Sequence, residues 1–189
     1  MAPASVPKPA ESLEALAAGV RACRRCDLWR PATQGVPGEG PPRAALFFVG
    51  EQPGDAEDLE GAPFVGPAGA IFDRALEEAG VDRAAAYVTN TVKHFKHEMR
   101  GKRRLHKKPD AGEIAACRWW LENEIRLVAP KVIVALGATA AAAVTGRPVS
   151  VLKGRGAART TAGAGAFVAV HPSPLLRLPG EAARRRAFC

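Results

Sequence analysis

The first residues in the chain that could do chemistry are two thiols in a C-x2-C pattern, Cys23 and Cys26. In a reducing compartment this spacing is typical of a zinc site, a redox pair or an iron–sulfur ligand pair. We expect no strand before the motif, which disfavours the redox pair. Unrelated thiols are the structural alternative. A metal would need two further ligands, and the candidates are Cys117 for one place and His94, His97 or Cys189 for the other.

Two other motifs combine turn-forming residues with groups that can contact a ligand. In GEQPG, residues 50–54, the glycines let backbone N–H groups approach a ligand closely. A plain strand-to-helix turn is the alternative. In HPSP, residues 171–174, two prolines stiffen the backbone and expose His171 and Ser173. His171 could donate a hydrogen bond to a small ligand, and Leu175 could enter a base stack as an apolar wedge. A proline-rich loop before a last helix is the alternative.

The fourth feature is a run of cations that contains a histidine. Residues 93–108 hold eight basic residues and one acid, a local charge of +7 in a chain whose formal net charge is +8. This charge predicts a polyanionic partner such as nucleic acid, with a solvated loop as the alternative. Nearby positive charge disfavours protonation of an imidazole, so we expect His106 to be neutral and nucleophilic. A phosphate-binding loop with an incidental histidine is the alternative.

Four short, continuously apolar runs are expected to form the strands that position these motifs. They lie at residues 44–49, 86–89, 132–136 and 166–170. Apolar runs without alternation are typical of a parallel sheet covered on both faces. The predicted helices lie at residues 11–21, 68–79, 110–128 and 139–145. Strands that alternate with helices indicate an α/β fold, here a three-layer α/β/α sandwich around a four-stranded, mainly parallel sheet.

The polar motifs directly follow the predicted strands. GEQPG comes after the first strand, Asn90 after the second, Gly137 after the third and HPSP after the fourth. In open α/β sheets, ligands bind beyond the carboxyl ends of the strands. We therefore expect these residues to meet at one rim of the sheet. The phosphate-loop pattern GxxxxGK[ST] is absent from the sequence.

The size and composition of the chain limit its class. With 189 residues, of which 47% are hydrophobic and 24% charged, the sequence is ordinary for one globular domain. We expect a flexible N-terminus over residues 1–10 and a single domain over residues 11–189. No stretch resembles a bilayer span, and the first twenty or so residues lack the apolar core of a signal peptide. We therefore expect a cytoplasmic protein that binds no membrane.

Taken together, the motifs resemble those of the uracil-DNA glycosylase superfamily. Within it they look most like the UdgX-type enzymes, which are related to the iron–sulfur family-4 glycosylases. The resemblance extends from about residue 23 to residue 177. It rests on C-x2-C, GEQPG, FVGPAG at residues 64–69, TNTVKH at 89–94, KRRLH at 102–106 and HPSP. The KRRLH segment is the part that is similar to UdgX.

The resemblance implies that uracil leaves the base stack and enters a pocket. Phe64 would stack on the base, and Asn90 would read its O4 and N3–H edge. Backbone N–H groups of GEQPG, together with His171, would hold O2 where negative charge develops. The residues that the resemblance assigns to uracil are Glu51, Gln52, Phe64, Asn90 and His171.

The resemblance also implies how the sugar reacts. Many superfamily members activate water with a carboxylate in the first motif, but here that position holds Gln52, an amide that cannot act as a base. In UdgX-type proteins the histidine of KRR[IL]H attacks C1′ and stays attached, which implies a single-turnover enzyme with His106 as the nucleophile. Glu51 would orient or deprotonate the imidazole, with Asp58 as a helper. The alternatives are a glycosylase that turns over and a non-catalytic nucleic-acid-binding module with a structural zinc.

A [4Fe–4S] cluster is implied as well. In family-4 enzymes all four cluster ligands are cysteines, whereas VKH here places a histidine where VKC is expected. Histidine ligation of iron–sulfur centres has precedent. The implied ligands are Cys23, Cys26, His94 and Cys117, and zinc is the alternative metal. Cys189 and His97 receive no role.

The implied partner is uracil-containing DNA, with single strands expected first and duplex as the alternative. Free uracil would be the product, and we expect the protein to be a monomer. The residues expected to contact DNA are Lys102, Arg103, Arg104, Ser173, Leu175 and Arg177.

Overall fold

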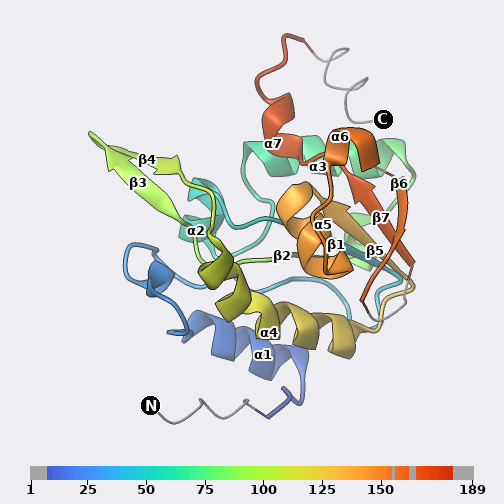
Figure 1. The fold of residues 1–189 in the computed structure, drawn as a ribbon, viewed down its shortest axis with the longest axis horizontal. Coiled ribbons are helices and arrows are strands. Elements are labelled where there is room, and N and C mark those ends of the chain that lie inside the picture. Colours follow the sequence, from blue (N-terminus) through green and yellow to red (C-terminus); the bar gives the residue numbers. More distant parts are fainter. Residues whose placement is uncertain (1–7, 155, 162–164, 181–189) are drawn as a thin grey trace.

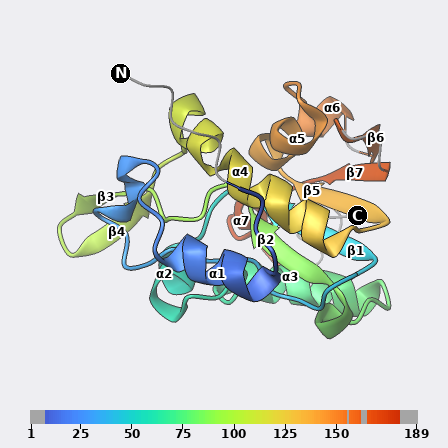
Figure 2. The ribbon, with the colours of Figure 1, turned by 90° about the horizontal axis from the view of Figure 1, so that it is seen from below.

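The computed structural model describes residues 8–154, 156–161 and 165–180. Cys189 and most of residues 1–10 therefore lie outside the described residues. The elements form three layers, with helices on both faces of a central sheet (Figure 1, Figure 2). This arrangement confirms the predicted α/β/α sandwich. No helix within the described ranges is long and apolar enough to cross a membrane.

The central sheet has five strands in the order β2-β1-β5-β7-β6. The four predicted strands are confirmed and run parallel, as β1 (Leu46–Gly50), β2 (Tyr87–Asn90), β5 (Val132–Leu136) and β7 (Gly165–Ala169). The expectation of four strands in total is wrong, because β6 (Gly156–Arg159) pairs with β7 as an antiparallel edge strand. Its sequence, GAAR, contains too little apolar surface to be recognised as a buried strand.

Three helices cover the sheet and a fourth packs on one of them, and each of the four was predicted to within two residues. α4 (Ala111–Val128) and α5 (Ala138–Thr145) pack on one face. α3 (Pro67–Glu78) packs on the opposite face. α1 (Leu13–Arg21) lies against α4, on its side away from the sheet (Figure 1). The two faces are therefore covered by helices that come from both halves of the chain.

Local chemistry explains the alternation and the helix ends. Phe47 and Val49 of β1 point into the core beneath α4 and α5, whereas Phe48 points toward α3, because successive strand residues face opposite sides. α4 begins at a capping box, since the Asp110 side chain accepts from the backbone N–H of Glu113 at 3.0 Å and the Glu113 carboxylate accepts from the N–H of Asp110 at 2.8 Å.

The basic segment, expected to be a loop, contains a hairpin. β3 (His97–Arg100) and β4 (Arg103–His106) form a two-stranded antiparallel sheet that projects from the body of the protein (Figure 1). Gly101 at its turn has a φ of 61°, which glycine adopts without strain. Both faces of the hairpin carry charged residues, so apolar alternation could not reveal it.

Five short elements complete the described chain. They are η1 (Asp27–Trp29), α2 (Asp55–Glu60), η2 (Arg83–Ala85), α6 (Val151–Gly154) and α7 (Pro172–Leu175). α2 follows the GEQPG turn, and α7 begins inside HPSP rather than after it. Both helices therefore start at the rim where the parallel strands end.

Candidate active site

The ends of β1 and β2 lie in close contact at the predicted rim. A Cβ atom on Gly50 would lie 2.4 Å from Oδ1 of Asn90 and 2.8 Å from the ring of Phe64. Only glycine therefore fits at position 50, and the amide and the ring share the space in front of it. Asn90 is 3% exposed, so its amide is shielded from bulk water.

The ends of β5 and β7 meet at the same rim. Gly137, after β5, has a φ of 93°, and a Cβ there would lie 3.2 Å from Cβ of His171, after β7. The imidazole of His171 lies 5.9 Å from the ring of Phe64, measured between centroids. Phe64 thus connects the β1–β2 side of the rim to the β5–β7 side.

Phe64 is held in an unusual backbone conformation. Its φ is 56°, in the left-handed region that a bulky side chain rarely adopts. Its ring packs 4.9 Å from Phe72, and a Cβ on Gly69 would collide with the Phe64 carbonyl oxygen at 1.8 Å. Arg83 also donates to the neighbouring Pro63 carbonyl at 2.9 Å. Strain of this kind is found at ligand sites whose surroundings enforce it.

Glu57 connects the Phe64 loop to the GEQPG turn. Its carboxylate accepts from the backbone N–H of Gly54 at 2.9 Å and from that of Gly66 at 2.8 Å. Sequence reasoning assigned no role to this residue. The signal was available, because a glutamate three positions after a turn glycine is typical of a capping residue.

His171 is a neutral hydrogen-bond donor. Burial lowers its pKa to about 4, against the opposing attraction of Glu51 and with a further lowering by His106. Its Nδ1 accepts from the backbone N–H of Ser173 at 3.1 Å. The single ring proton therefore resides on Nε2, which is the tautomer needed to donate to a developing oxyanion.

The structure brings Glu51 and His106 together. Oε1 of Glu51 lies 3.4 Å from Nε2 of His106, whose side chain is 52% exposed. Oε2 of Glu51 accepts from Oγ1 of Thr139 at 2.5 Å. Burial by itself would raise the pKa of Glu51, but the hydrogen bonds from His106 and Thr139 outweigh it and the pKa lies below its ordinary value. The carboxylate is thus ionised beside an accessible imidazole.

Gln52 fastens both ends of the hairpin to the body. Its Nε2 donates to the carbonyls of Lys96 and Lys107, both at 3.1 Å, and its Oε1 accepts from the N–H of Lys96 at 3.2 Å. The side chain is 7% exposed. A carboxylate could not make the two donated bonds, so the hairpin accounts for an amide at this position.

Cross-strand register places His97 directly opposite His106. Phe95, just before the hairpin, stacks on His97 with centroids 4.9 Å apart and lies 6.4 Å from the ring of His106. The guanidinium of Arg104 lies over the same phenyl ring at 5.5 Å. Phe95 therefore packs against the hairpin face that carries His106.

Arg104, expected to contact DNA, and Asp58, expected to help catalysis, contact each other. Nη1 of Arg104 lies 2.6 Å from Oδ2 of Asp58, and its Nε lies 2.5 Å from Oδ1 of Asp55. Asp58 is fully buried and also accepts from the N–H of Thr33 at 3.0 Å. None of its described contacts involves Glu51 or His106, so the pair fixes the hairpin against α2.

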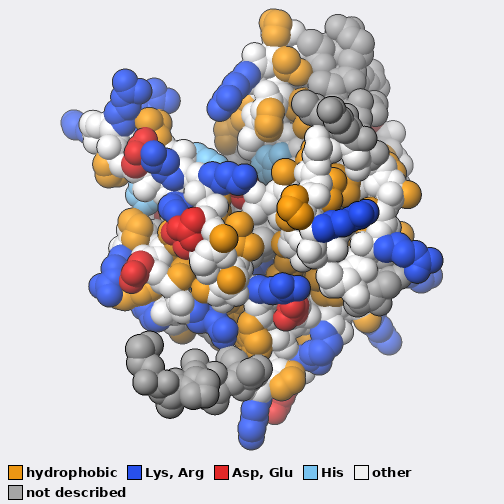
Figure 3. Space-filling view, in the orientation of Figure 1, with side chains coloured by type: hydrophobic (Ala, Val, Ile, Leu, Met, Phe, Trp, Pro, Cys, Tyr) orange, Lys and Arg blue, Asp and Glu red, His pale blue; other side chains and the backbone are white. Residues whose placement is uncertain are grey.

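The charge of the basic segment divides into two groups. Lys93 is buried and paired with Glu124, so the expectation that it belongs to a surface patch is wrong. Three other cations have carboxylate partners, namely Lys96, Arg104 and Lys107. The exposed cations for which the described residues offer no ion pair are Arg100, Lys102, Arg103 and Lys108. Lys and Arg side chains gather over the projecting hairpin in Figure 3. Three of these four cations, Arg100, Lys102 and Arg103, lie at the tip of the hairpin, so the tip and not the whole segment forms most of the unpaired positive surface.

The HPSP segment differs from expectation in one side chain. Leu175 is 2% exposed, because α7 starts at Pro172 and turns this residue toward the core. The exposed neighbour is Leu176, at 39%. Ser173 and Arg177 are exposed, as a role in DNA contact requires.

The implied metal ligands come from one buried region. Cys23 and Cys117 pack in the same apolar cluster as Val20, and Cys26 packs against it. A hydrogen bond from Cys117 lowers the pKa of Cys26 to about 6. His94 reaches this region, because a Cβ on Gly35 would contact both the Val20 carbonyl and Nε2 of His94.

The donors fit an iron–sulfur cluster in their chemistry and burial. Among the described residues, Nδ1 of His94 is a buried nitrogen without a hydrogen-bond partner, so it is available to a metal. Trp120 donates from Nε1 to Sγ of Cys23 at 3.2 Å, as outer groups do to ligating sulfur. Across the described residues, however, no three His, Cys, Asp or Glu side chains are arranged to hold a metal ion.

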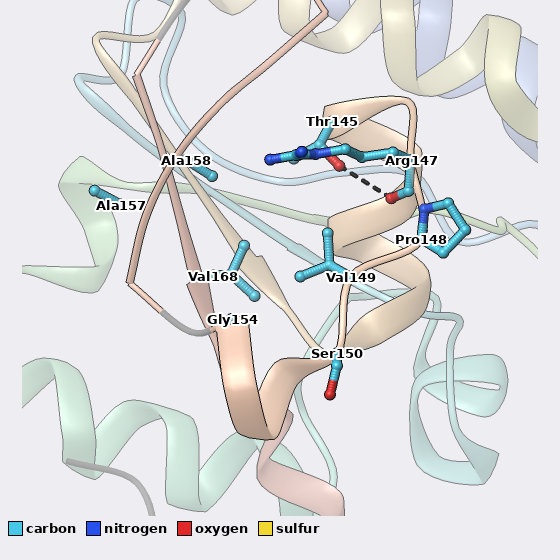
Figure 4. Close-up of a pocket in the computed structure, with 9 residues that line it drawn as sticks. All are labelled: Thr145, Arg147, Pro148, Val149, Ser150, Gly154, Ala157, Ala158 and Val168. Carbon is cyan, nitrogen blue, oxygen red and sulfur yellow. Dashed lines mark hydrogen bonds between the residues drawn. The ribbon is translucent and has the colours of Figure 1, made fainter.

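A separate pocket of about 260 Å³ lies beside α5 and the edge strand β6 (Figure 4). It is lined by Thr145, Arg147, Pro148, Val149, Ser150, Gly154, Ala157, Ala158 and Val168. None of the predicted site residues lines it, so it is distinct from the rim described above.

Comparisons with known proteins place the chain in a family. Residues 37–188 match the model of the uracil DNA glycosylase superfamily. A type-4 uracil-DNA glycosylase of Thermotoga maritima is 38% identical over 177 residues, which is 93% of this chain and 88% of the relative. A type-5 uracil-DNA glycosylase of Pyrobaculum aerophilum is 29% identical over 174 residues, covering 82% of this chain and 73% of the relative.

A type-4 uracil-DNA glycosylase of Sulfurisphaera tokodaii is 41% identical over 128 residues, which is 67% of this chain. The match covers 55% of that relative and, for the type-4 enzyme of Saccharolobus solfataricus, 56%. The chain thus spans about half the length of these two relatives.

Proposed function

Because this chain belongs to the uracil-DNA glycosylase superfamily, we propose that it is a DNA-repair enzyme that removes uracil from DNA. The observation that carries the proposal is the convergence of Asn90 and His171 on the ring of Phe64, which shares the space in front of Gly50 with Asn90 and lies 5.9 Å from the imidazole of His171. A ring, an amide and a neutral donor in one water-shielded place match the face, the edge and the O2 atom of uracil.

Each group would act on a different part of the base. Phe64 stacks on the ring, and Asn90 both donates to O4 and accepts from N3–H. As the C1′–N1 bond breaks, its electron pair passes to uracil and negative charge develops on O2. Nε2–H of His171 and the backbone N–H groups of GEQPG other than that of Gly54, which donates to Glu57, stabilise that charge, which lowers the barrier to departure.

The sugar would then be captured by His106. Departure of uracil leaves an oxocarbenium-like C1′. The proton of Nε2 passes to Glu51 while the Nε2 electron pair forms the bond to C1′, so the product is a neutral alkylated imidazole and a neutral carboxyl group. The 3.4 Å separation of Nε2 and Oε1 supports this proton transfer.

Gln52 supports persistence of the adduct. An amide cannot deprotonate water, and the bonds of Gln52 to Lys96 and Lys107 hold the hairpin, and with it His106, close to the rim. One enzyme molecule would therefore react once. This predicted single turnover separates the proposal from a conventional glycosylase.

The test is incubation with uracil-containing single-stranded DNA, followed by a denaturing gel and a separate measurement of released uracil. We expect uracil release and a band shifted by the mass of the protein. His106→Ser should abolish the shifted band, and a thymine oligonucleotide should give none. His97→Ser, on the opposite strand of the hairpin, is the matched control and should keep the band.

The other outcomes separate the alternatives. Uracil release without a shifted band would establish a turning-over glycosylase. Salt-sensitive DNA binding without uracil release would establish a non-catalytic module and contradict the proposal. The same gel with duplex substrate decides between the proposed preference for single strands and activity on duplex DNA.

A [4Fe–4S] cluster held by Cys23, Cys26, His94 and Cys117 is part of the proposal. The cluster would tie α1 and α4 to the segment after β2, and it takes part in no step above. Purified protein should contain iron and sulfide and absorb visible light, and Cys117→Ala should lose all three. Colourless protein with zinc and no iron would contradict the cluster.

We also propose that the protein is a cytoplasmic monomer, since ligating thiols must stay reduced. Light scattering of the purified protein measures the oligomeric state. A stable dimer would contradict this part of the proposal.

A further inference from the structure

Glu51 lies between two partners, of which sequence reasoning identified only one. Its Oε1 faces Nε2 of His106, and its Oε2 accepts the hydroxyl proton of Thr139. We propose that Thr139 is the positioning residue that completes a Thr139–Glu51–His106 relay and aims the carboxylate at the nucleophile. The inference rests on the proposed function, because it assigns Glu51 to the proton of His106.

The fold fixes Thr139 where such a group is needed. It stands in the first turn of α5, directly after the glycine turn at Gly137 that packs against His171. Its side chain is 7% exposed, and α5 packs on the sheet through Ala140, Ala141 and Val144. The hydroxyl is therefore carried by a rigid element rather than by a loop, as precise orientation requires.

The hydrogen bond constrains the carboxylate. A hydroxyl has one proton to donate, and Thr139 donates it to Oε2. With Oε2 held by α5, rotation of the carboxylate is restricted and Oε1 stays directed at His106. Nucleophile, base and orienting group in hydrogen-bond sequence is the arrangement by which enzymes activate weak nucleophiles.

The groups that face Glu51 come from three parts of the fold. They are His106 on β4, Thr139 on α5 and His171 after β7. The hydroxyl and the two imidazoles all favour the ionised carboxylate, against burial. Removing the hydroxyl would raise the pKa of Glu51. As the pH falls, its carboxylate would therefore become protonated, and unable to accept the proton of His106, at a higher pH than in the unaltered protein.

Thr139→Val tests this inference because valine keeps the shape and removes only the hydroxyl. The measurement is the single-turnover rate of the shifted band as a function of pH. We expect a rate roughly 10- to 100-fold lower at neutral pH, the range for loss of one hydrogen bond to a charged group. The pH below which the rate falls should move to a higher value. Thr139→Ser should restore both the rate and the position of this acid limb.

Thr145→Val, at the other end of α5, is the matched control, since the Thr145 hydroxyl donates to the carbonyl of Ala141 at 2.7 Å and not to Glu51. This variant should leave the single-turnover rate and the acid limb of its pH profile unchanged. If Thr139→Val does not fold, Thr139→Ser against Thr139→Ala makes the same comparison. The hydroxyl that holds the carboxylate is then the only group in which the serine and alanine variants differ.

The experiment distinguishes failure of the role of Thr139 from failure of the proposed function. A shifted band from the unaltered protein, with the same rate and acid limb in Thr139→Val, would overturn the role of Thr139 alone. The absence of a shifted band from the unaltered protein at every pH would contradict the proposed function and the relay together.

Discussion

Nζ of Lys93 lies 2.7 Å from Oε2 of Glu124, and both side chains are almost completely buried. The same ammonium donates to Oγ1 of Thr89 and to the carbonyl of Asn90, each at 2.7 Å. The pair therefore joins α4 to the end of β2, immediately behind the amide proposed to read uracil. It is a support for the site rather than a contact for DNA.

Breaking this pair should be strongly destabilising. Glu124→Gln leaves the Lys93 ammonium buried without its counter-charge, and we expect the free energy of unfolding to fall by about 3–5 kcal/mol. Urea unfolding measures the change. Glu122→Gln is the matched control on the same helix, because its pair with Arg118 is exposed and should contribute less than about 1 kcal/mol. Equal effects of the two variants would contradict a supporting role for Lys93.

Gln52→Glu should loosen the hairpin. The variant loses both donated hydrogen bonds and sets a carboxylate against the carbonyls of Lys96 and Lys107, which we expect to lower stability by about 2 kcal/mol. Hydrogen exchange should accelerate at the amides of residues 96–107. Amides of β5, which make no described contact with Gln52, serve as the internal control. Unchanged exchange in the hairpin would show that Gln52 does not hold it.

The tip of the hairpin should dominate the electrostatic part of DNA binding. Neutralising Lys102 and Arg103 together should reduce the slope of log affinity against log salt by about one for each phosphate that the variant no longer neutralises. Titrations with single-stranded DNA at several salt concentrations measure it. Arg118→Gln, on the exposed side of α4, should leave the slope unchanged. A slope that is the same in all three proteins would place the DNA elsewhere.

His171 should make stability depend on pH below neutrality. Its pKa falls from an ordinary 6.5 to about 4 on folding, so between these values the unfolded chain binds the proton and the folded chain does not. The contribution of the neutral His171 to the free energy of unfolding is thus fully present above pH 6.5. It declines by up to about 3 kcal/mol as the pH falls to 4. The difference in unfolding free energy between the unaltered protein and His171→Gln should narrow over this window. A difference independent of pH would contradict the buried, neutral imidazole.

Much of the fold was predictable because its determinants are local. The apolar runs identified four parallel strands, and the spacing of apolar residues on one face located four helices. The strand-end motifs indicated the shared rim. The edge strand β6 and the β3–β4 hairpin were missed, since neither has the apolar pattern by which strands are recognised.

Residue types and their order along the chain therefore determined the sandwich and the rim at which Glu51, Asn90 and His171 meet. The tertiary structure alone decided which cations of the basic segment have carboxylate partners and that Leu175 is buried. It also decided that Gln52 holds the hairpin and that Thr139 holds the carboxylate of Glu51. The physical reason is distance along the chain. Glu51 and Thr139 are 88 residues apart and Lys93 and Glu124 are 31 apart, and such contacts depend on packing that no local pattern encodes.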